Sequence, residues 1–353
     1  MTASCRHFGQ CGGCVYQNLS VAEYRARKRS CVVEALAKAG LVDASVAEIA
    51  EVGPGTRRRA TIKAAKSAGA MRVGFHAAAS HEIVDMHECL VLTPGLFALV
   101  PHLRDMMDAL LGEGEKAELH VTEAENGADV AIRWKRSLTP ALVGAAAQWG
   151  RRLKLSRLSA NGEPLFMNQA PFVTIGSVRL PLQIESFLQA TAEGETMLQT
   201  KVLTAAKGAR SVLDLFAGVG TFTLPLAQRA KVHAVEADAA ALAALAEAVR
   251  FGTRLKPVTT ERRDLFRRPL TALELVGFDL VLLDPPRAGA LSQARELAKS
   301  RVGRLIYVSC SAESFARDAQ VLVAGGYRMG TVSPIDQFLW SSHIEVTATF
   351  TRA

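Results

Sequence analysis

Long apolar runs are missing from this sequence of 353 residues. No stretch approaches the ~20 apolar residues that a membrane span requires, and the N-terminal segment MTASCRHFGQCGGC has no apolar core of signal-peptide length. Internal repeats and low-complexity tracts are also missing. We therefore expect a cytoplasmic globular protein with no membrane partner. Its 49% of hydrophobic residues are enough for about two packed domains.

Cysteine is scarce, with six residues in the chain. Disulfides are rare in the cytosol, so metal ligands, nucleophiles and buried apolar residues are better explanations for these six than cross-links. Cys31 lies beside Val32 on the apolar stripe of a helix predicted over residues 20–39, which Ser20 and Glu23 begin as a capping box. We expect Cys31 to be a core residue.

Acidic residues are fewer than basic ones, 34 against 42, which gives a net charge of +8. Clustered cations suit a polyanion, because each phosphate that a cation neutralises releases a condensed counterion. A solvated surface explains the charge alone equally well. The clusters are Arg25, Arg27, Lys28 and Arg29; Arg57 to Arg59; Arg133, Lys135 and Arg136; and Arg151, Arg152 and Lys154.

The pattern of apolar residues divides the chain into four parts. The central part alternates as short strands do and is interrupted by a helix from Pro94 to about Leu111. The N-terminal 17 residues have too few apolar residues to fold without a metal site or a cross-link. The parts are a cysteine loop (1–17, with Cys89), a helix expected to pack on the C-terminal domain (18–40), an α+β central domain (41–185) and a C-terminal α/β domain (186–353).

In the C-terminal domain the rhythm changes to strand, glycine-rich turn, helix and strand, with nearly continuous apolar strands. This rhythm is typical of a doubly wound parallel sheet. The last two segments, YRMGTVSPID and SHIEVTATFT, are too close in sequence for a helical crossover. We therefore expect them to form an antiparallel pair at the sheet edge.

The turn after the first of these strands, DLFAGVGTF, predicts a cofactor site. Glycine lets the backbone approach a ligand closely, and an acid at the end of the next strand, Glu236, can accept both ribose hydroxyls. The spacing is not GxGxxG, and the antiparallel end of the sheet is a second departure from dehydrogenases. Both features resemble class I S-adenosylmethionine-dependent methyltransferases, which have a seven-stranded mixed sheet. Asp264, in ERRDLF, falls where that superfamily contacts adenine, although a helix N-cap explains it nearly as well.

The next motif, DPPR, indicates the atom that is modified. Methyltransferases that act on amino groups carry an aromatic residue at its fourth place, where this chain has Arg287, so an exocyclic amine is disfavoured. Cys310 follows the strand RLIYVS, and a thiolate that adds to carbon 6 of a pyrimidine makes carbon 5 nucleophilic. A buried strand cysteine is the simpler alternative. RNA cytosine-5 methyltransferases carry a second cysteine in the DPPRAG region, and its absence here favours uracil.

Taken together, DLFAGVGTFTLPLA, DPPRAG, the LIYVS segment, ESFLQATAEGE and SSHIEV resemble the RNA (uracil-5-)-methyltransferase family over essentially the whole chain. The resemblance implies that Cys310 is the nucleophile, that Glu345 is the base that releases the product, and that Asp284 orients the uracil. It also implies that Gln189 contacts cofactor and substrate. The expected cofactor contacts are Gln189, Asp214, Phe216, Gly218, Gly220, Glu236, Asp264 and Asp284.

Two positions depart from the family pattern. Ser311 and Ala312 stand where Asn-Pro usually follows the nucleophile, so the loop loses a rigid proline, although Ser311 can still cap the following helix. Ala190 and Thr191 stand where Val-Asn usually follows the glutamine.

The cysteines of CRHFGQCGGC and MHECLVL form one further motif. Four thiolates at this spacing fit zinc as well as iron and sulfide, and a redox CxxC pair is a third reading that the lack of a thioredoxin-like context weakens. The motif resembles the [4Fe-4S] motif of the ribosomal-RNA branch of the family, which the tRNA member lacks. The implied ligands are Cys5, Cys11, Cys14 and Cys89.

The resemblance also implies a partner. Many relatives begin with a separate OB-like TRAM module, whereas Cys5 here is near the first residue, so 23S ribosomal-RNA members without that module are the expected branch; a trimmed chain would look the same. We expect a monomer that acts on 23S rRNA before or during ribosome assembly. The alternatives are an RNA cytosine-5 methyltransferase, a tRNA uracil-5 methyltransferase, and a catalytically dead RNA-binding or iron–sulfur protein.

Overall fold

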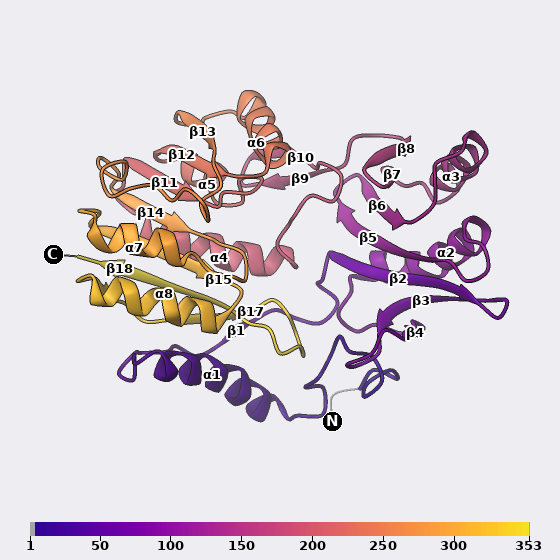
Figure 1. Cartoon of the computed structure of the whole chain (residues 1–353), viewed down its shortest axis with the longest axis horizontal. Coiled ribbons are helices and arrows are strands. Elements are labelled where there is room, and N and C mark those ends of the chain that lie inside the picture. The colour runs from indigo at the N-terminus through magenta and orange to yellow at the C-terminus, as the bar shows by residue number, and fades with distance from the viewer. Residues whose placement is uncertain (1–3, 353) are drawn as a thin grey trace.

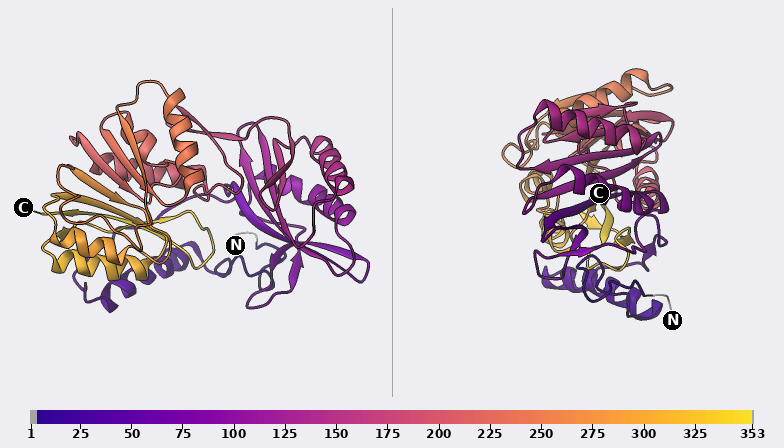
Figure 2. Two further views of the ribbon diagram at one scale, coloured as in Figure 1. Left: turned by 45° about the horizontal axis from the view of Figure 1, so that its top comes forward. Right: turned by 90° about the vertical axis from the view of Figure 1, so that its right-hand side faces the viewer.

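The computed structural model describes residues 4–352, which form two lobes side by side (Figure 1). The larger lobe is an α/β sandwich and contains the C-terminal end of the described chain, whereas the N-terminal loop lies against β3 (Ala70–His76) of the central lobe. The smaller, central lobe is a curved sheet with helices on one face (Figure 2). No described helix is long and apolar enough to cross a membrane.

The N-terminal helix belongs to the larger lobe. Helix α1 (Val21–Lys38) begins at the predicted capping box, because the Glu23 backbone N–H donates to Ser20 Oγ and the Ser20 N–H donates to the Glu23 carboxylate. Its apolar stripe packs on α8 (Ala312–Ala324), and Val32 lies fully buried in the core there. Cys31, which we expected in the core, is only half-buried.

The central lobe contains a seven-stranded sheet in the order β4-β3-β2-β5-β6-β7-β8 among the described residues. Helix α2 (Pro94–Leu110) begins at Pro94 as predicted, after an N-cap at Thr93, and α3 (Pro140–Arg152) packs beside it on the same face (Figure 1). The strands are β2 (Arg59–Ser67), β3 (Ala70–His76), β4 (Ile83–Asp85), β5 (Lys116–Ala124), β6 (Gly127–Trp134), β7 (Arg157–Ala160) and β8 (Glu163–Met167).

A hairpin connects the lobes. Strands β9 (Phe172–Ile175) and β10 (Val178–Pro181) pair with each other, and their apolar side chains pack against α6 (Ala239–Phe251). The sequence pattern assigned this hairpin to the central domain, whereas its main packing partner is a helix of the larger lobe.

The sheet of the larger lobe has nine strands among the described residues, in the order β1-β17-β18-β15-β14-β11-β12-β13, with β16 beside β18. The predicted sheet had seven. The difference is two strands of two residues each, β1 (Ala50–Glu51) and β16 (Arg328–Met329). The other strands are β11 (Ser211–Leu215), β12 (Lys231–Glu236), β13 (Val258–Arg262), β14 (Leu280–Leu283), β15 (Arg304–Ser309), β17 (Ser333–Asp336) and β18 (Glu345–Thr351).

The direction of the strands follows the prediction. Strands β11 to β15 run parallel, and β18 runs antiparallel both to β15 and to β17. The outermost strand at that end is β1, which pairs parallel with β17. Helices α1, α7 (Leu291–Lys299) and α8 cover one face, and α4 (Ala192–Ala205) with α5 (Thr223–Ala227) covers the other.

Candidate active site

The cofactor residues predicted from the glycine-rich turn lie at the ends of β11 and β12. Asp214 is fully buried; its Oδ2 accepts from Thr223 Oγ1 at 2.5 Å, and its Oδ1 has no partner. Burial raises the pKa of this carboxyl to about 7. Glu236 Oε2 accepts the backbone N–H of Gly218 at 2.9 Å, so the second strand end is tied to the turn.

The turn itself has the shape of a cradle. Phe216, Gly218 and Gly220 have φ values of 62°, 53° and 96°, which only glycine adopts readily. A Cβ at Gly218 would meet no atom within 4 Å, whereas one at Gly220 would lie 2.5 Å from a Leu245 methyl group. The turn therefore needs Gly220 for close packing against α6, and it has open space in front of Gly218. This space and the unpartnered Asp214 Oδ1 fit a bound S-adenosylmethionine.

An aromatic pair flanks the turn. The rings of Phe216 and Phe266 lie with centroids 5.5 Å apart, and Phe266 is 48% exposed. Phe266 was missed in the sequence, although it stands two residues after Asp264 in ERRDLF. Asp264 caps the local turn, because its Oδ1 accepts from the Phe266 and Arg267 N–H groups. The contacts of Asp264 in this structure are therefore those of a capping residue, the alternative to an adenine contact.

The three predicted catalytic residues lie at the same edge of the sheet as the cofactor turn, beside the ends of β14 and β15. Ser309 pairs with Val346 in the antiparallel β15–β18 ladder, so the next residues, Cys310 and Glu345, stand opposite each other. Asp284 follows β14, the neighbour of β15. The three predicted catalytic residues are thereby brought together, although they are up to 61 residues apart in sequence.

Glu345, Asp284 and Cys310 lie close together and are shielded from solvent, and the pKa of each is raised. Burial raises the pKa of Glu345 to about 7, partly offset by a hydrogen bond from Gln337 and by the charge of Arg59. Desolvation raises the pKa of Asp284 well above its usual value, and the neighbouring Glu345 carboxyl raises it further. Burial and then the Glu345 and Asp284 charges raise the pKa of the Cys310 thiol to about 11. The resting thiol is therefore protonated at neutral pH.

Gln189 joins this group through a residue that the sequence did not indicate. Gln337, directly after β17, donates from its Nε2 to Gln189 Oε1 at 2.6 Å and to Glu345 Oε1 at 3.0 Å. All three side chains are buried, at 2–4% exposure. No short motif could reveal Gln337, because its partners come from the sheet ladder and from a segment 148 residues away.

The arginines at 57–59 make contacts within the chain that their charge alone did not indicate. Arg58 donates to Glu195 Oε2 at 2.6 Å and to the Gln189 carbonyl, and its own N–H donates to the Ala190 carbonyl. Desolvation lowers the pKa of Arg59 to about 10, and its guanidinium lies 4.3 Å from the ring centroid of Phe187. This segment joins the two lobes at the active site.

The four predicted ligand cysteines gather around one cavity of about 40 Å³. Cys5, Cys11 and Cys14 reach it from the N-terminal loop, which is fixed where the Gly12 N–H donates to the His76 carbonyl, and Cys89 reaches it from the segment before α2. Burial and the other thiols raise the pKa of Cys14 to about 12. Within residues 4–352, no three His, Cys, Asp or Glu side chains meet the geometry of a single-metal site.

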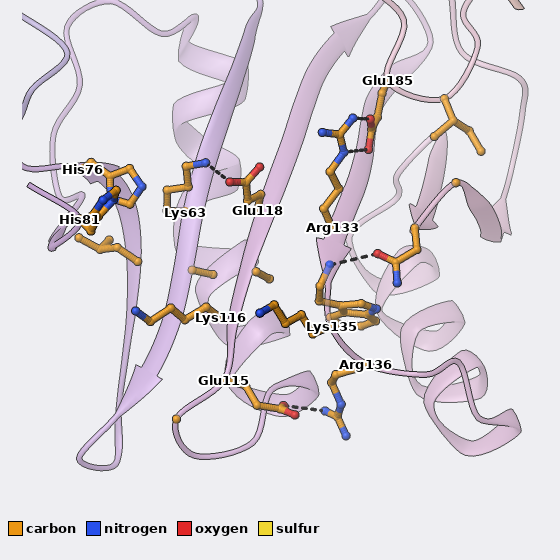
Figure 3. Close-up of a pocket in the computed structure, with 18 of the residues that line it drawn as sticks. Lys63, His76, His81, Glu115, Lys116, Glu118, Arg133, Lys135, Arg136 and Glu185 are labelled. Atoms are coloured by element: carbon orange, nitrogen blue, oxygen red, sulfur yellow. Dashed lines mark hydrogen bonds and ion pairs between the residues drawn. The ribbon is translucent and has the colours of Figure 1, made fainter.

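A large groove of about 1500 Å³ lies on the face of the central sheet that the helices leave open (Figure 3). Ala240, at the start of α6 in the larger lobe, also lines it. Three of its cations are paired with glutamates: Lys63 with Glu118, Arg133 with Glu185, and Arg136 with Glu115. Lys116 and Lys135 are exposed in the groove, and in Figure 3 neither is joined to a carboxylate.

Comparison with known proteins identifies the family. Residues 177–353 match the model of the tRNA (uracil-5-)-methyltransferase family. An uncharacterized RNA methyltransferase of Brucella suis is 45% identical over 350 residues, 99% of this chain and 84% of the relative. The 23S rRNA (uracil(1939)-C(5))-methyltransferase RlmD of Aeromonas salmonicida is 33% identical over 98% of this chain and 81% of its own length.

A solved structure supports the fold. The Pyrococcus abyssi tRNA (uracil-54, C5)-methyltransferase, crystallised with S-adenosyl-L-homocysteine, superposes with a TM-score of 0.76 at 22% identity, covering 96% of this chain and 86% of that one. The likeness extends over both lobes, and the larger lobe has the S-adenosylmethionine-dependent methyltransferase fold. The chain therefore belongs to the family of S-adenosylmethionine-dependent RNA (uracil-5-)-methyltransferases.

Proposed function

We propose that this enzyme methylates carbon 5 of a uridine in 23S rRNA through a covalent adduct on Cys310. The observation that carries the proposal is the placement of Cys310 opposite Glu345, with Asp284 on the adjacent strand end. S-adenosylmethionine, when bound at the glycine-rich turn, supplies an electrophilic methyl group. The 23S target is supported by the likeness to RlmD over nearly the whole chain.

Each step assigns a bond to one of these residues. Cys310 gives its proton to solvent, and its sulfur bonds to carbon 6 of uracil; the 5,6 π electrons move onto the carbonyl oxygen as an enolate, which makes carbon 5 nucleophilic. Carbon 5 then takes the methyl group and carries both that group and its original hydrogen. Glu345 removes this hydrogen as a proton, the 5,6 double bond re-forms, and the thiolate leaves. Asp284, at the adjacent strand end, orients the uracil.

Two variants test this sequence of steps. Cys310→Ala should bind RNA but transfer no methyl group and form no adduct. Glu345→Gln should methylate at most once and remain attached to its RNA, because nothing removes the proton from carbon 5. Denaturing gels with radiolabelled 23S fragments and S-adenosylmethionine should show a shifted band for Glu345→Gln and none for Cys310→Ala. Normal turnover by either variant would refute the mechanism, and methylation of tRNA in place of 23S rRNA would refute the target.

We also propose that the cysteine cavity holds a [4Fe-4S] cluster through Cys5, Cys11, Cys14 and Cys89. The support is that the four thiols surround one cavity from two segments of the chain. Such a cluster would tie the N-terminal loop, which has little apolar surface of its own, to the central lobe.

The groove of the central sheet is our candidate for a second RNA contact outside the active site. Its exposed Lys116 and Lys135 offer charge to phosphates, and it extends to α6 beside the cofactor turn. Three cation–glutamate pairs along its length present further guanidinium and ammonium groups that phosphates can share.

A further inference from the structure

The hydrogen bonds of Gln337 fix which way its side-chain amide points. The Thr191 backbone N–H, which can only donate, points at Gln337 Oε1 at 3.4 Å. The amide of Gln337 therefore has its oxygen toward Thr191 and its NH2 group toward the active site. Both NH2 hydrogens are then used, one on Gln189 Oε1 and the other on Glu345 Oε1.

This arrangement fixes the orientation of a second amide. Because Gln189 presents its oxygen to Gln337, its own NH2 group is turned the opposite way. A flipped Gln189 would place two NH2 groups against each other at 2.6 Å, with no acceptor between them. The orientation of the Gln189 amide is thus set by a backbone N–H through one intermediate side chain.

The backbone around Gln337 is itself held firmly. The carboxylate of the preceding Asp336 is fully buried, and it accepts from Lys28 Nζ at 2.9 Å and from the Tyr24 hydroxyl, both on α1. Lys28 also donates to the Phe338 carbonyl at 3.3 Å. Gln337 therefore stands between two residues that are anchored to the same helix, which suits a group that must aim two hydrogen bonds at once.

We propose that Gln337 is a positioning residue for the methylation reaction, which holds the Glu345 carboxylate as a hydrogen-bond acceptor and turns the NH2 group of Gln189 toward the substrate. This inference rests on the proposed role of Glu345 as the base. A donor on Glu345 favours its ionised form, the form that removes the proton from carbon 5. The other charged or titratable groups that face Glu345 are Arg59 from β2, Asp284 after β14 and Cys310 after β15.

The test is Gln337→Met, which keeps the length of the side chain and removes its hydrogen bonds. In single turnovers on a 23S rRNA fragment, breakdown of the methylated adduct should slow about 10- to 100-fold, the loss expected for one hydrogen bond to a charged group. The pH midpoint of breakdown should move upward by about one unit, because the ionised form of Glu345 loses its donor. Formation of the adduct should slow less than its breakdown.

Lys28→Met is the matched control, because it loosens the same segment through α1 and leaves the Gln337 amide in place. A merely structural role predicts that both variants slow formation and breakdown alike, with no change of the pH midpoint, and this result would overturn the proposal. A double variant with Gln189→Met gives a second readout. If Gln337 orients Gln189, the effects of the two single variants on adduct formation will not add. Strict additivity would contradict the proposal that Gln337 orients the Gln189 amide.

The outcome can be separated from that of the proposed function. If Glu345→Gln traps the adduct while Gln337→Met behaves as the unmodified enzyme, only the inference on Gln337 fails. If Glu345→Gln turns over normally, the base is misassigned and both fail.

Discussion

Glu345 shows at the scale of one residue how function opposes stability. Its pKa in the folded protein is raised to about 7, above the 4.5 of a free side chain, because it is buried. The folded state then binds a proton more tightly than the unfolded state, so its stability is full below about pH 4.5 and falls as pH rises toward 7. In the role we propose for it, a base that is ionised near neutral pH, Glu345 thus costs folding free energy.

We therefore predict that Glu345→Gln raises the melting temperature at pH 8 and changes it little at pH 4.5. The gain should be on the order of 1–3 kcal/mol at pH 8, since each unit of pKa corresponds to about 1.4 kcal/mol. Calorimetry at the two pH values measures it. An equal gain at both would mean that the carboxylate charge is not the cause.

Some residues of the site can be predicted from the strand pattern of the sequence, and others cannot. Asp284 and Cys310 follow neighbouring parallel strands, and Glu345 begins the antiparallel strand beside Cys310, so the predicted strand directions bring the three together. Gln337 and Arg59 could not be found this way. Their roles depend on contacts between segments that only the finished fold brings side by side, such as the pair of Gln337 and Gln189.

At the scale of elements, the central lobe was the least predictable. Helix α3 has a Thr139 cap and Pro140 at its first turn, but its fully buried positions are Ala146 and Gly150, too small to give an apolar stripe. The small size has a reason, because a Cβ at Gly150 would lie 2.5 Å from the Phe166 ring. The β7–β8 hairpin was detectable, since its turn is Asn-Gly, a strong hairpin signal.

The open face of the central sheet yields a prediction about RNA. Replacing Lys116 and Lys135 together with alanine should weaken binding of a 23S fragment and reduce the slope of log affinity against log salt by about 0.7 to 0.9 for each phosphate that the variant no longer neutralises. Filter binding at several salt concentrations measures this. The exposed pair Lys38 and Lys299, far from the groove in sequence, provides a control with the same change of charge. Equal slopes in the two double variants would show that the groove does not contact RNA phosphates.

The cysteine loop yields a second prediction at this scale. Protein purified without oxygen should be brown and contain about four irons and four sulfides per chain. Cys89→Ser should lose the colour and increase proteolysis within the N-terminal loop, because the loop then loses its tie to the central lobe. One zinc in a colourless protein would contradict the cluster, and Cys31→Ser, which alters a cysteine outside the cavity, should retain both metal and colour.

For the whole molecule, the larger lobe is discontinuous in sequence. Residues 20–51 supply α1 and β1 to it, and the central lobe is inserted before the rest of the lobe follows. A fragment of residues 186–353 should therefore aggregate, because the β17 edge and the apolar surface of α8 are uncovered. Adding a peptide of residues 18–52 should restore solubility, as light scattering can show. A soluble, cooperatively melting fragment on its own would contradict this account.

The same discontinuity has a consequence for the order in which the protein is made. Tyr24 leaves the ribosome 312 residues before Asp336, its hydrogen-bond partner. Helix α1 thus waits through nearly the whole of translation, with its apolar stripe uncovered, while the inserted lobe already has all of its own strands. The candidate active site cannot be assembled until β18, the last strand, is released, so an incomplete chain lacks Glu345 and its neighbours.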